Sequence, residues 1–132
     1  MVNVKLNGVY QGVDELVEHV RIAPELVNIP TLKITDTSEA NVSGGYLLEV
    51  DERSGEAYWF KSTMTASSAV DYYLLQELLN NVDGNPRLST FLYKPRGGKL
   101  TFGPVRDFDI AMGNVNYSQC DQIVGLYIRN AQ

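Results

Sequence analysis

The sequence predicts a small α+β domain, and three patterns lead to this prediction. Short apolar or alternating segments, each bounded by turn residues, predict β-strands joined in hairpins. One segment, 67–81, carries apolar residues at helical spacing and predicts the main helix. An acidic loop and a second hairpin follow it. At 132 residues, 44% of them hydrophobic, the chain is long enough for one domain with a modest core.

Residues 2–18 predict a β-hairpin at the start of the chain. Apolar residues alternate on both sides of Asn7-Gly8, a dipeptide that two-residue hairpin turns favour. Gly12 in the second strand predicts a bulge or the close approach of a neighbour. Residues 14–18 fit either a continued strand or the start of a helical turn. His19 has no second His, Ser or Cys placed to use it, so it is not predicted to be functional.

The segment 30–45 has the composition of a surface loop, with one short strand predicted at 31–34. Residues 46–50 then predict a buried strand, and 58–60 predict its partner across a polar turn.

Glu49 interrupts the apolar strand 46–50. A buried carboxylate requires a cation, a metal ion or hydrogen bonds. A ligand and the nearby side chains of Lys61 and Arg53 are equally good candidates for that partner.

The main helix is predicted to end before Asp83-Gly84-Asn85-Pro86. This break places Asp83, Arg87 and Ser89 on one loop, directly before a predicted strand at 90–94. A Gly-rich turn and a returning strand at 99–102 complete an antiparallel hairpin.

Asp107 and Asp109 follow this hairpin and are candidates for a metal site. In an extended segment both carboxylates project to one face, while Phe108 packs on the other. Two carboxylates this close repel unless a cation or a proton lies between them. Mg²⁺ commonly takes one or two protein carboxylates together with nucleotide phosphates. The pair therefore predicts a site for Mg²⁺ or Mn²⁺, although Asp-x-Asp alone also occurs in solvated loops.

The composition argues against several other classes of function. Sixteen acidic and eleven basic residues give a net charge of -5, which disfavours non-specific binding to nucleic acid. The one cysteine, Cys120, cannot form an internal disulfide, and no Cys/His cluster exists to hold zinc. No apolar run approaches the ~20 residues of a membrane span, and no basic-then-apolar leader opens the chain.

The order of helix, acidic loop, hairpin and Asp-Phe motif is also the order found in protein kinases. There a catalytic aspartate lies on the loop after a helix, and the acid of an Asp-Phe motif holds Mg²⁺ on the nucleotide. In this chain Asp107 lies 24 residues after Asp83, and no His-Arg precedes Asp83.

Several stretches match those of a known family in the same order: 6–13, 44–51, 73–78 with Asp83, 91–94, 103–105, and 107–109 with Gly113. Through them the chain resembles the CotH kinase family, the atypical protein kinases of spore coats. The resemblance implies an atypical protein-kinase-like core and ATP- and metal-dependent phosphorylation of Ser or Thr in protein substrates. It covers roughly the middle third to half of a full-length member. We therefore expect 1–132 to form a single partial domain, with a β-rich part at 1–65 and the helix and both loops at 66–132.

The resemblance also implies roles for individual residues. Asp83 resembles the catalytic aspartate that orients or deprotonates the substrate hydroxyl. Asp107, with Asp109, resembles the metal-binding acid. Ser89 falls where some relatives carry a metal-contacting Asn.

Glu18, Glu49 and Lys61 are candidates for the nucleotide side of such a site. Arg106 departs from the family, which usually carries Trp at this position. A cation here favours the ionised form of Asp107 but competes with Mg²⁺ for it. By this resemblance, relatives carry three parts that have no counterpart in the 132 residues. These are covering strands before residue 2, a segment between 61 and 67, and a C-terminal helical part.

Two other functions are compatible with the sequence. One is a non-catalytic surface or coat binding protein of the same family. The other is a metal-dependent nucleotide-sugar glycosyltransferase that uses Asp107-x-Asp109, which leaves the loop of Asp83 without a role. A spore-coat, cell-surface or secreted location is suggested by the family resemblance alone.

Overall fold

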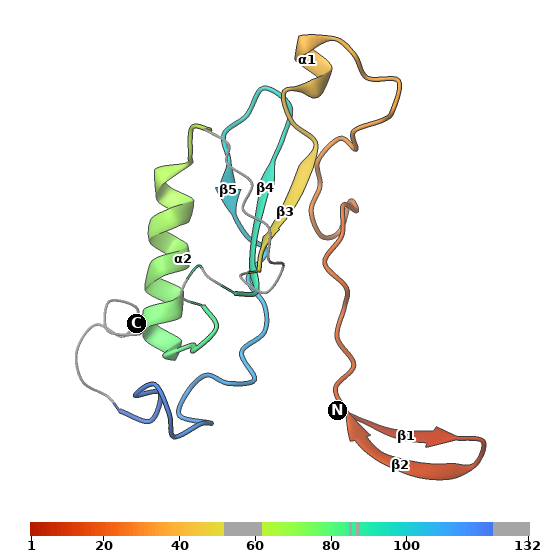
Figure 1. Ribbon diagram of the computed structural model, residues 1–132, viewed down its shortest axis with the longest axis vertical. Helices are drawn as coiled ribbons and strands as arrows, with labels where there is room; N and C mark the ends of the chain where they lie inside the picture. The colour runs from red at the N-terminus through yellow and green to blue at the C-terminus, as the bar shows by residue number, and fades with distance from the viewer. Residues whose placement is uncertain (52–61, 85, 87, 123–132) are drawn as a thin grey trace.

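The computed structural model describes residues 1–51, 62–84, 86 and 88–122. Two separate antiparallel sheets and one main helix, α2 (Ala66–Leu79), form a small α+β fold (Figure 1). The first sheet consists of β1 (Val2–Leu6) and β2 (Val9–Asp14). The second has the strand order β3 (Tyr46–Val50), β4 (Thr90–Lys94) and β5 (Thr101–Phe102). Among the described elements, none is a helix long and apolar enough to cross a membrane.

The N-terminal hairpin is confirmed, but it is shorter than predicted. Asn7 and Gly8 form its turn with φ values of 51° and 84°, as a type I′ turn requires. The register shifts between Val4 and Lys5, where Val4 pairs with Gly12, so the predicted bulge is present. β2 ends at Asp14, and residues 15–20 adopt neither a strand nor a helical turn. Among the described elements, β1 and β2 contact only each other.

The strand predicted at 31–34 is wrong, because the chain turns there instead of extending. The amide of Lys33 donates to the Asp36 carboxylate at 2.8 Å, and the amide of Asp36 donates to the Lys33 carbonyl at 2.9 Å. These two bonds close a tight turn that an extended strand cannot make. The one-turn helix α1 (Glu39–Val42) follows, with Ser38 as its N-cap.

Arg96 fastens this region to the turn between β4 and β5. Its guanidinium donates to the Asp36 carboxylate at 2.7 Å and to the Thr31 carbonyl at 3.1 Å. The side chains of Arg96 and Asp36 are 27% and 12% exposed, so the ion pair is partly shielded from water.

The central strand of the second sheet is β4, which pairs with β3 on one side and β5 on the other. The strands predicted at 46–50 and 90–94 are confirmed. The returning strand predicted at 99–102 is limited to Thr101–Phe102. The partner predicted at 58–60 lies outside the described residues.

The prediction that Glu49 is buried is wrong. It lies opposite Phe91 in the β3–β4 pairing, and its side chain is exposed while the rest of β3 is half-buried. An exposed carboxylate is hydrated and needs no buried partner. Lys61, one of the two partners considered for it, lies outside the described residues.

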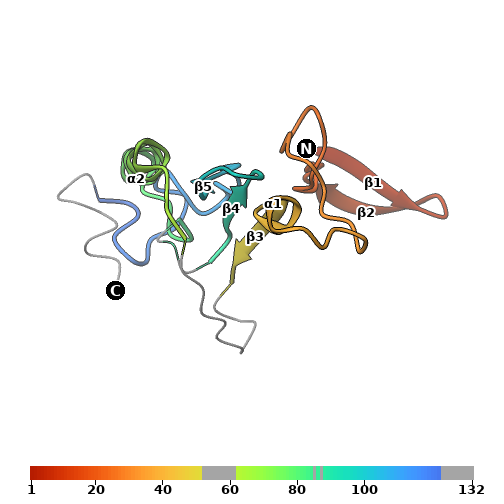
Figure 2. The same cartoon turned by 90° about the horizontal axis from the view of Figure 1, so that it is seen from above.

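The main helix is confirmed to within two residues at each end. Thr65 precedes α2, and Asn80 ends it in the left-handed conformation with φ 47°. The helix lies beside β5, on the opposite side of the sheet from β1 and β2 (Figure 2). Ser68 joins helix and sheet, since its hydroxyl accepts the amide of Phe102 at 3.2 Å.

A buried polar contact lies between α2 and β4. The hydroxyls of Tyr72 and Thr90 are 2.8 Å apart, and these residues are 7% and 0% exposed. The Tyr72 ring also packs on Phe102, with ring centroids 4.8 Å apart. Burial raises the pKa of Tyr72, and its hydrogen bonds to Thr90 and Gln76 lower it. The neutral hydroxyl therefore anchors the helix to the sheet.

We predict that Tyr72→Phe lowers the free energy of unfolding by about 0.5–1.5 kcal/mol, because a buried hydrogen bond is lost while the ring packing is kept. Thr90 still donates to the Leu88 carbonyl, which limits the loss. Urea denaturation measures the effect. The control Tyr10→Phe removes a hydroxyl from a side chain that is 56% exposed and is expected to change stability by less than about 0.5 kcal/mol. Equal effects of the two substitutions would contradict the anchoring role.

Candidate functional site

Two loops that are far apart in the sequence lie side by side beyond the end of α2. The Met112 amide donates to the Leu79 carbonyl at 2.7 Å, and the Val82 amide donates to the Ile110 carbonyl at 3.4 Å. One loop carries Asp83, and we call it the Asp83 loop (residues 81–84). The other carries Asp107 and Asp109, and we call it the Asp107 loop (residues 106–114). These backbone contacts bring the acids of the two loops into one region.

Asn81 joins the two loops through its side chain. It is 1% exposed, and each of its polar atoms makes a hydrogen bond. Its side-chain nitrogen donates to the Asp107 carbonyl at 3.2 Å, and its side-chain oxygen accepts the Asp83 amide at 3.3 Å. Its backbone amide donates to the Gln76 carbonyl, and its backbone carbonyl accepts from the Gly84 amide, both at 3.2 Å. One buried amide therefore links the backbone of Asp83 to that of Asp107.

Sequence reasoning missed Asn81, although it stands two residues before Asp83. An Asn after the last turn of a helix is ordinary in a loop, so its type and position gave no signal. Its burial and its contacts with Asp83 and Asp107 distinguish it from Asn80 beside it.

The ionised form of Asp107 is disfavoured by its surroundings. Partial burial raises the pKa of Asp107, and the neighbouring carboxyl of Asp109 raises it further. The Arg106 guanidinium lowers this pKa, and the charge of Asp83 raises it. Asp83 is thus close enough to act electrostatically on Asp107. A cation bound here would relieve the repulsion.

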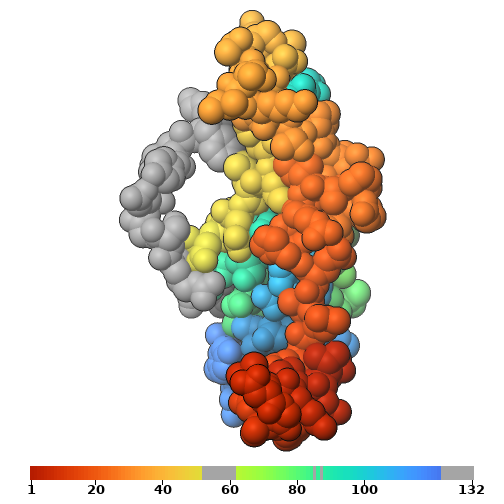
Figure 3. Space-filling view, turned by 90° about the vertical axis from the view of Figure 1, so that its right-hand side faces the viewer, coloured from red at the N-terminus to blue at the C-terminus, as the bar shows by residue number. Residues whose placement is uncertain are grey.

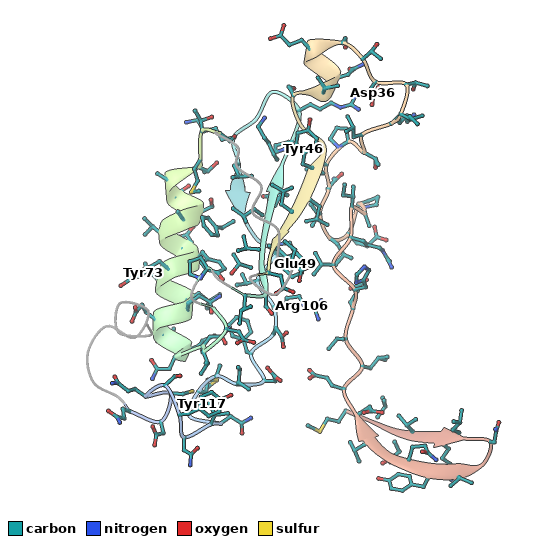
Figure 4. All side chains as sticks on the ribbon, viewed as in Figure 1. Asp36, Tyr46, Glu49, Tyr73, Arg106 and Tyr117 are labelled. Atoms are coloured by element: carbon teal, nitrogen blue, oxygen red, sulfur yellow. The ribbon has the colours of Figure 1, made fainter. Side chains whose placement is uncertain are left out.

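Arg106 lies over the ring of Phe91, with its guanidinium carbon 6.0 Å from the ring centroid. Figure 4 shows Arg106 near Glu49 at the lower end of the sheet, and both residues line a pocket of about 360 Å³ together with His19. Glu49 therefore shares a pocket with Arg106, but Asp107 and Asp109 do not line this pocket.

A larger pocket, of about 820 Å³, lies over the Asp107 loop. Its lining includes Arg106, Asp107 and Asp109 from this loop and Glu15 and Glu18 from the segment after β2. Segments from the N-terminal part of the chain, coloured red to orange, lie across this face (Figure 3). Of the acids predicted for the nucleotide side, Glu18 thus shares a pocket with the two metal candidates.

The other predicted site residues are placed differently. Asp83 is half-buried and is not among the residues that line the larger pocket. Ser89 has φ 48° and directly precedes β4, and no described contact joins it to Asp107 or Asp109. Lys61 lies outside the described residues.

The model of the CotH kinase protein family matches residues 46–131. This range is well over half of the chain and contains the second sheet, α2 and both loops. The chain belongs to the CotH kinase family. No curated protein and no solved structure matches it.

The acids of this CotH family member fit a magnesium site that is completed by a ligand. Among the residues that the structure describes, no group of three or more His, Cys, Asp and Glu side chains could hold a metal ion alone. Mg²⁺ does not require such a group, since it usually keeps several waters and takes one or two carboxylates plus phosphates. Asp107 and Asp109 supply two carboxylates at the lining of one pocket.

We predict that Asp107→Asn and Asp109→Asn each raise the free energy of unfolding at pH 7 without metal, because one of two repelling charges is removed. The side chains are exposed, so the gain is on the order of a few tenths of a kcal/mol. A raised carboxyl pKa in the folded state makes the protein most stable below the ordinary pKa and less stable as the pH rises through the raised value. The gain should therefore shrink as the pH falls through the raised pKa of Asp107 and be lost below the ordinary carboxyl pKa of about 4.

Urea denaturation at pH 7 and at a pH below about 4 measures the difference in the free energy of unfolding between each variant and the wild type. The control is Glu25→Gln, an exposed acid in the turn at residues 24–26 that does not line the larger pocket. Variants of the pair that are less stable than the wild type at pH 7 would contradict the repulsion.

Proposed function

We propose that this chain carries part of an atypical Ser/Thr protein-kinase core, which transfers phosphate from ATP to hydroxyl groups of protein substrates. The observation that supports the proposal best is the joining of the Asp83 and Asp107 loops in a member of the CotH kinase family. Phosphoryl transfer depends on positioned charge more than on covalent chemistry by the protein. Acids held at fixed places on two connected loops are suited to that task.

In this proposal Asp107 and Asp109 hold Mg²⁺ or Mn²⁺, with Ser89 as a further candidate ligand. The metal ion, when bound, neutralises charge on the ATP phosphates. Asp83 orients the substrate hydroxyl and accepts its proton. The half-buried position of Asp83 is compatible with access by a protein substrate.

The nucleotide side of the proposed site comprises Glu18, Glu49 and Lys61. Glu18 lines the pocket that contains Asp107, and Glu49 lines the pocket beside it. Arg106 lines both pockets, so its guanidinium can pair with phosphate oxygens as well as with the carboxylates. The proposed location, in a spore coat, at a cell surface or secreted, rests on the family alone.

A second candidate function is binding of a partner protein without catalysis. The observation that favours it is that Asp83 is absent from the lining of the pocket that contains Asp107 and Asp109. A protein of this kind would retain the connected loops as a structural feature. Its binding would need neither acid nor a metal ion.

We predict that Mn²⁺ with ATP raises the thermal midpoint of the wild-type chain, because a ligand that binds the native state stabilises it by about 2.7 kcal/mol at one hundred times its Kd. Asp107→Ala is expected to abolish the shift, since it removes a carboxylate from the metal site. Asp83→Ala is expected to keep the shift and to lose phosphate transfer to protein. A thermal-shift titration and a radiolabelled phosphate assay measure the two effects.

The control Glu25→Ala removes an exposed acid that does not line the larger pocket and should behave as the wild type in both assays. No shift in the wild type, or a shift that survives Asp107→Ala, would contradict the kinase proposal. Metal-independent binding of a partner protein with both acids dispensable would support the second candidate.

A further inference from the structure

We infer that Asn81 is a positioning residue that couples the Asp107 loop to Asp83. Its side chain contacts the backbone of both Asp83 and Asp107, so a change in the Asp107 loop reaches the residue proposed as the catalytic base. The inference rests on the proposed function for the roles of these two acids. The coupling itself is a property of the hydrogen bonds and can be tested without any ligand.

The chemistry of the contact selects an amide at position 81. A donor must face the Asp107 carbonyl and an acceptor must face the Asp83 amide, and the Asn side chain supplies one of each. An Asp keeps the acceptor but places a second oxygen against the carbonyl. A Leu of similar size supplies neither group. Because Asn81 is 1% exposed, water cannot substitute for the lost bonds without entering the interior.

In the Asp107 loop, the carbonyl that accepts the bond from Asn81 belongs to a residue in an uncommon backbone conformation. Asp107 has φ 68°, in the left-handed region that most residues with a Cβ atom avoid. Such a conformation persists only where its surroundings hold it. The hydrogen bond from Asn81 holds the carbonyl of this same residue. A backbone rearrangement at Asp107 therefore alters the bond to Asn81 directly.

The Asp83 loop is held tightly enough to respond to such a change. Gly84 lies against the buried side chain of Gln76, where a Cβ atom would come within 2.1 Å of its Oε1 atom. The Gly84 amide also donates to the Asn81 carbonyl. With Gly84 packed on α2, movement of the Asn81 side chain is transmitted to the Asp83 amide between them.

The test follows the amide resonance of Asp83 by NMR while the Asp107 loop is perturbed. Asp107→Asn is the perturbation, because it changes the charge of that loop without requiring a metal ion. In the wild-type background it is expected to shift the Asp83 amide. In the Asn81→Leu background this shift should fall to about a third or less, the result of losing both bonds.

Asn114→Leu is the matched control. The Asn114 side chain also donates to the backbone of the Asp107 loop, at the Asp109 carbonyl, but no described contact joins it to the Asp83 loop. The coupling should therefore survive this substitution. If Asn81→Leu does not fold, Asn81→Asp replaces it, since it loses the donor to Asp107 and should also uncouple the loops.

Retention of the full shift in the tested Asn81 variant would overturn the inference, as would an equal loss in Asn114→Leu. Wild-type protein that fails to bind Mn²⁺ with ATP would count against the proposed function while leaving this result intact. In the phosphate-transfer assay of this protein, Asn81→Leu is expected to lower kcat about tenfold or more and to leave KM for ATP within about threefold of the wild-type value. An unchanged kcat would contradict the positioning role.

Discussion

The buried amide of Asn81 lies where the two halves of the candidate site meet. It can bridge them because Asn80 leaves the helix in the left-handed conformation and turns the chain toward the Asp107 loop. The backbone bonds from Met112 to Leu79 and from Val82 to Ile110 keep the two loops adjacent. The fold thus supplies the proximity, and Asn81 supplies the register between the acids. Without that register the acids would be neighbours with no fixed relation.

Without a ligand, the repulsion between carboxylates in the site destabilises the folded chain. Asp107 and Asp109 repel each other, and Asp83 adds to the negative charge near them. Arg106 offsets part of this repulsion while its guanidinium lies on the Phe91 ring. Such an arrangement lowers the stability of the fold, and arrangements of this kind are common at functional sites. The combination of repelling acids and one adjacent cation is suited to a ligand that carries both metal and phosphate.

Regular periodicity made some elements of this fold predictable. The strands at 46–50 and 90–94 and the helix α2 are confirmed. In α2, however, Val70, Leu74 and Leu78 of the predicted apolar face are exposed, and the buried side chains are Tyr72 and Gln76. The strand expected at 31–34 fails because the Asp36 side chain closes a turn there, a local bond that apolar content does not reveal. Glu49 was misjudged because an apolar strand pattern does not show which face is covered. The order of Asp83 and Asp107 follows from the sequence, but Asn81 could be found only from the fold.

The central claim is that the Asp107 loop binds a cation and that the Asp83 loop lies beside this site. Paramagnetic broadening of backbone amides by Mn²⁺ tests it most directly, because the effect depends steeply on distance from a single bound ion. With ATP and substoichiometric Mn²⁺, we expect the amides of Asp83 and Gly84 to broaden together with those of Asp107 and Asp109. Broadening confined to one loop, or spread over exposed acids that do not line the larger pocket, such as Glu25, would contradict this arrangement.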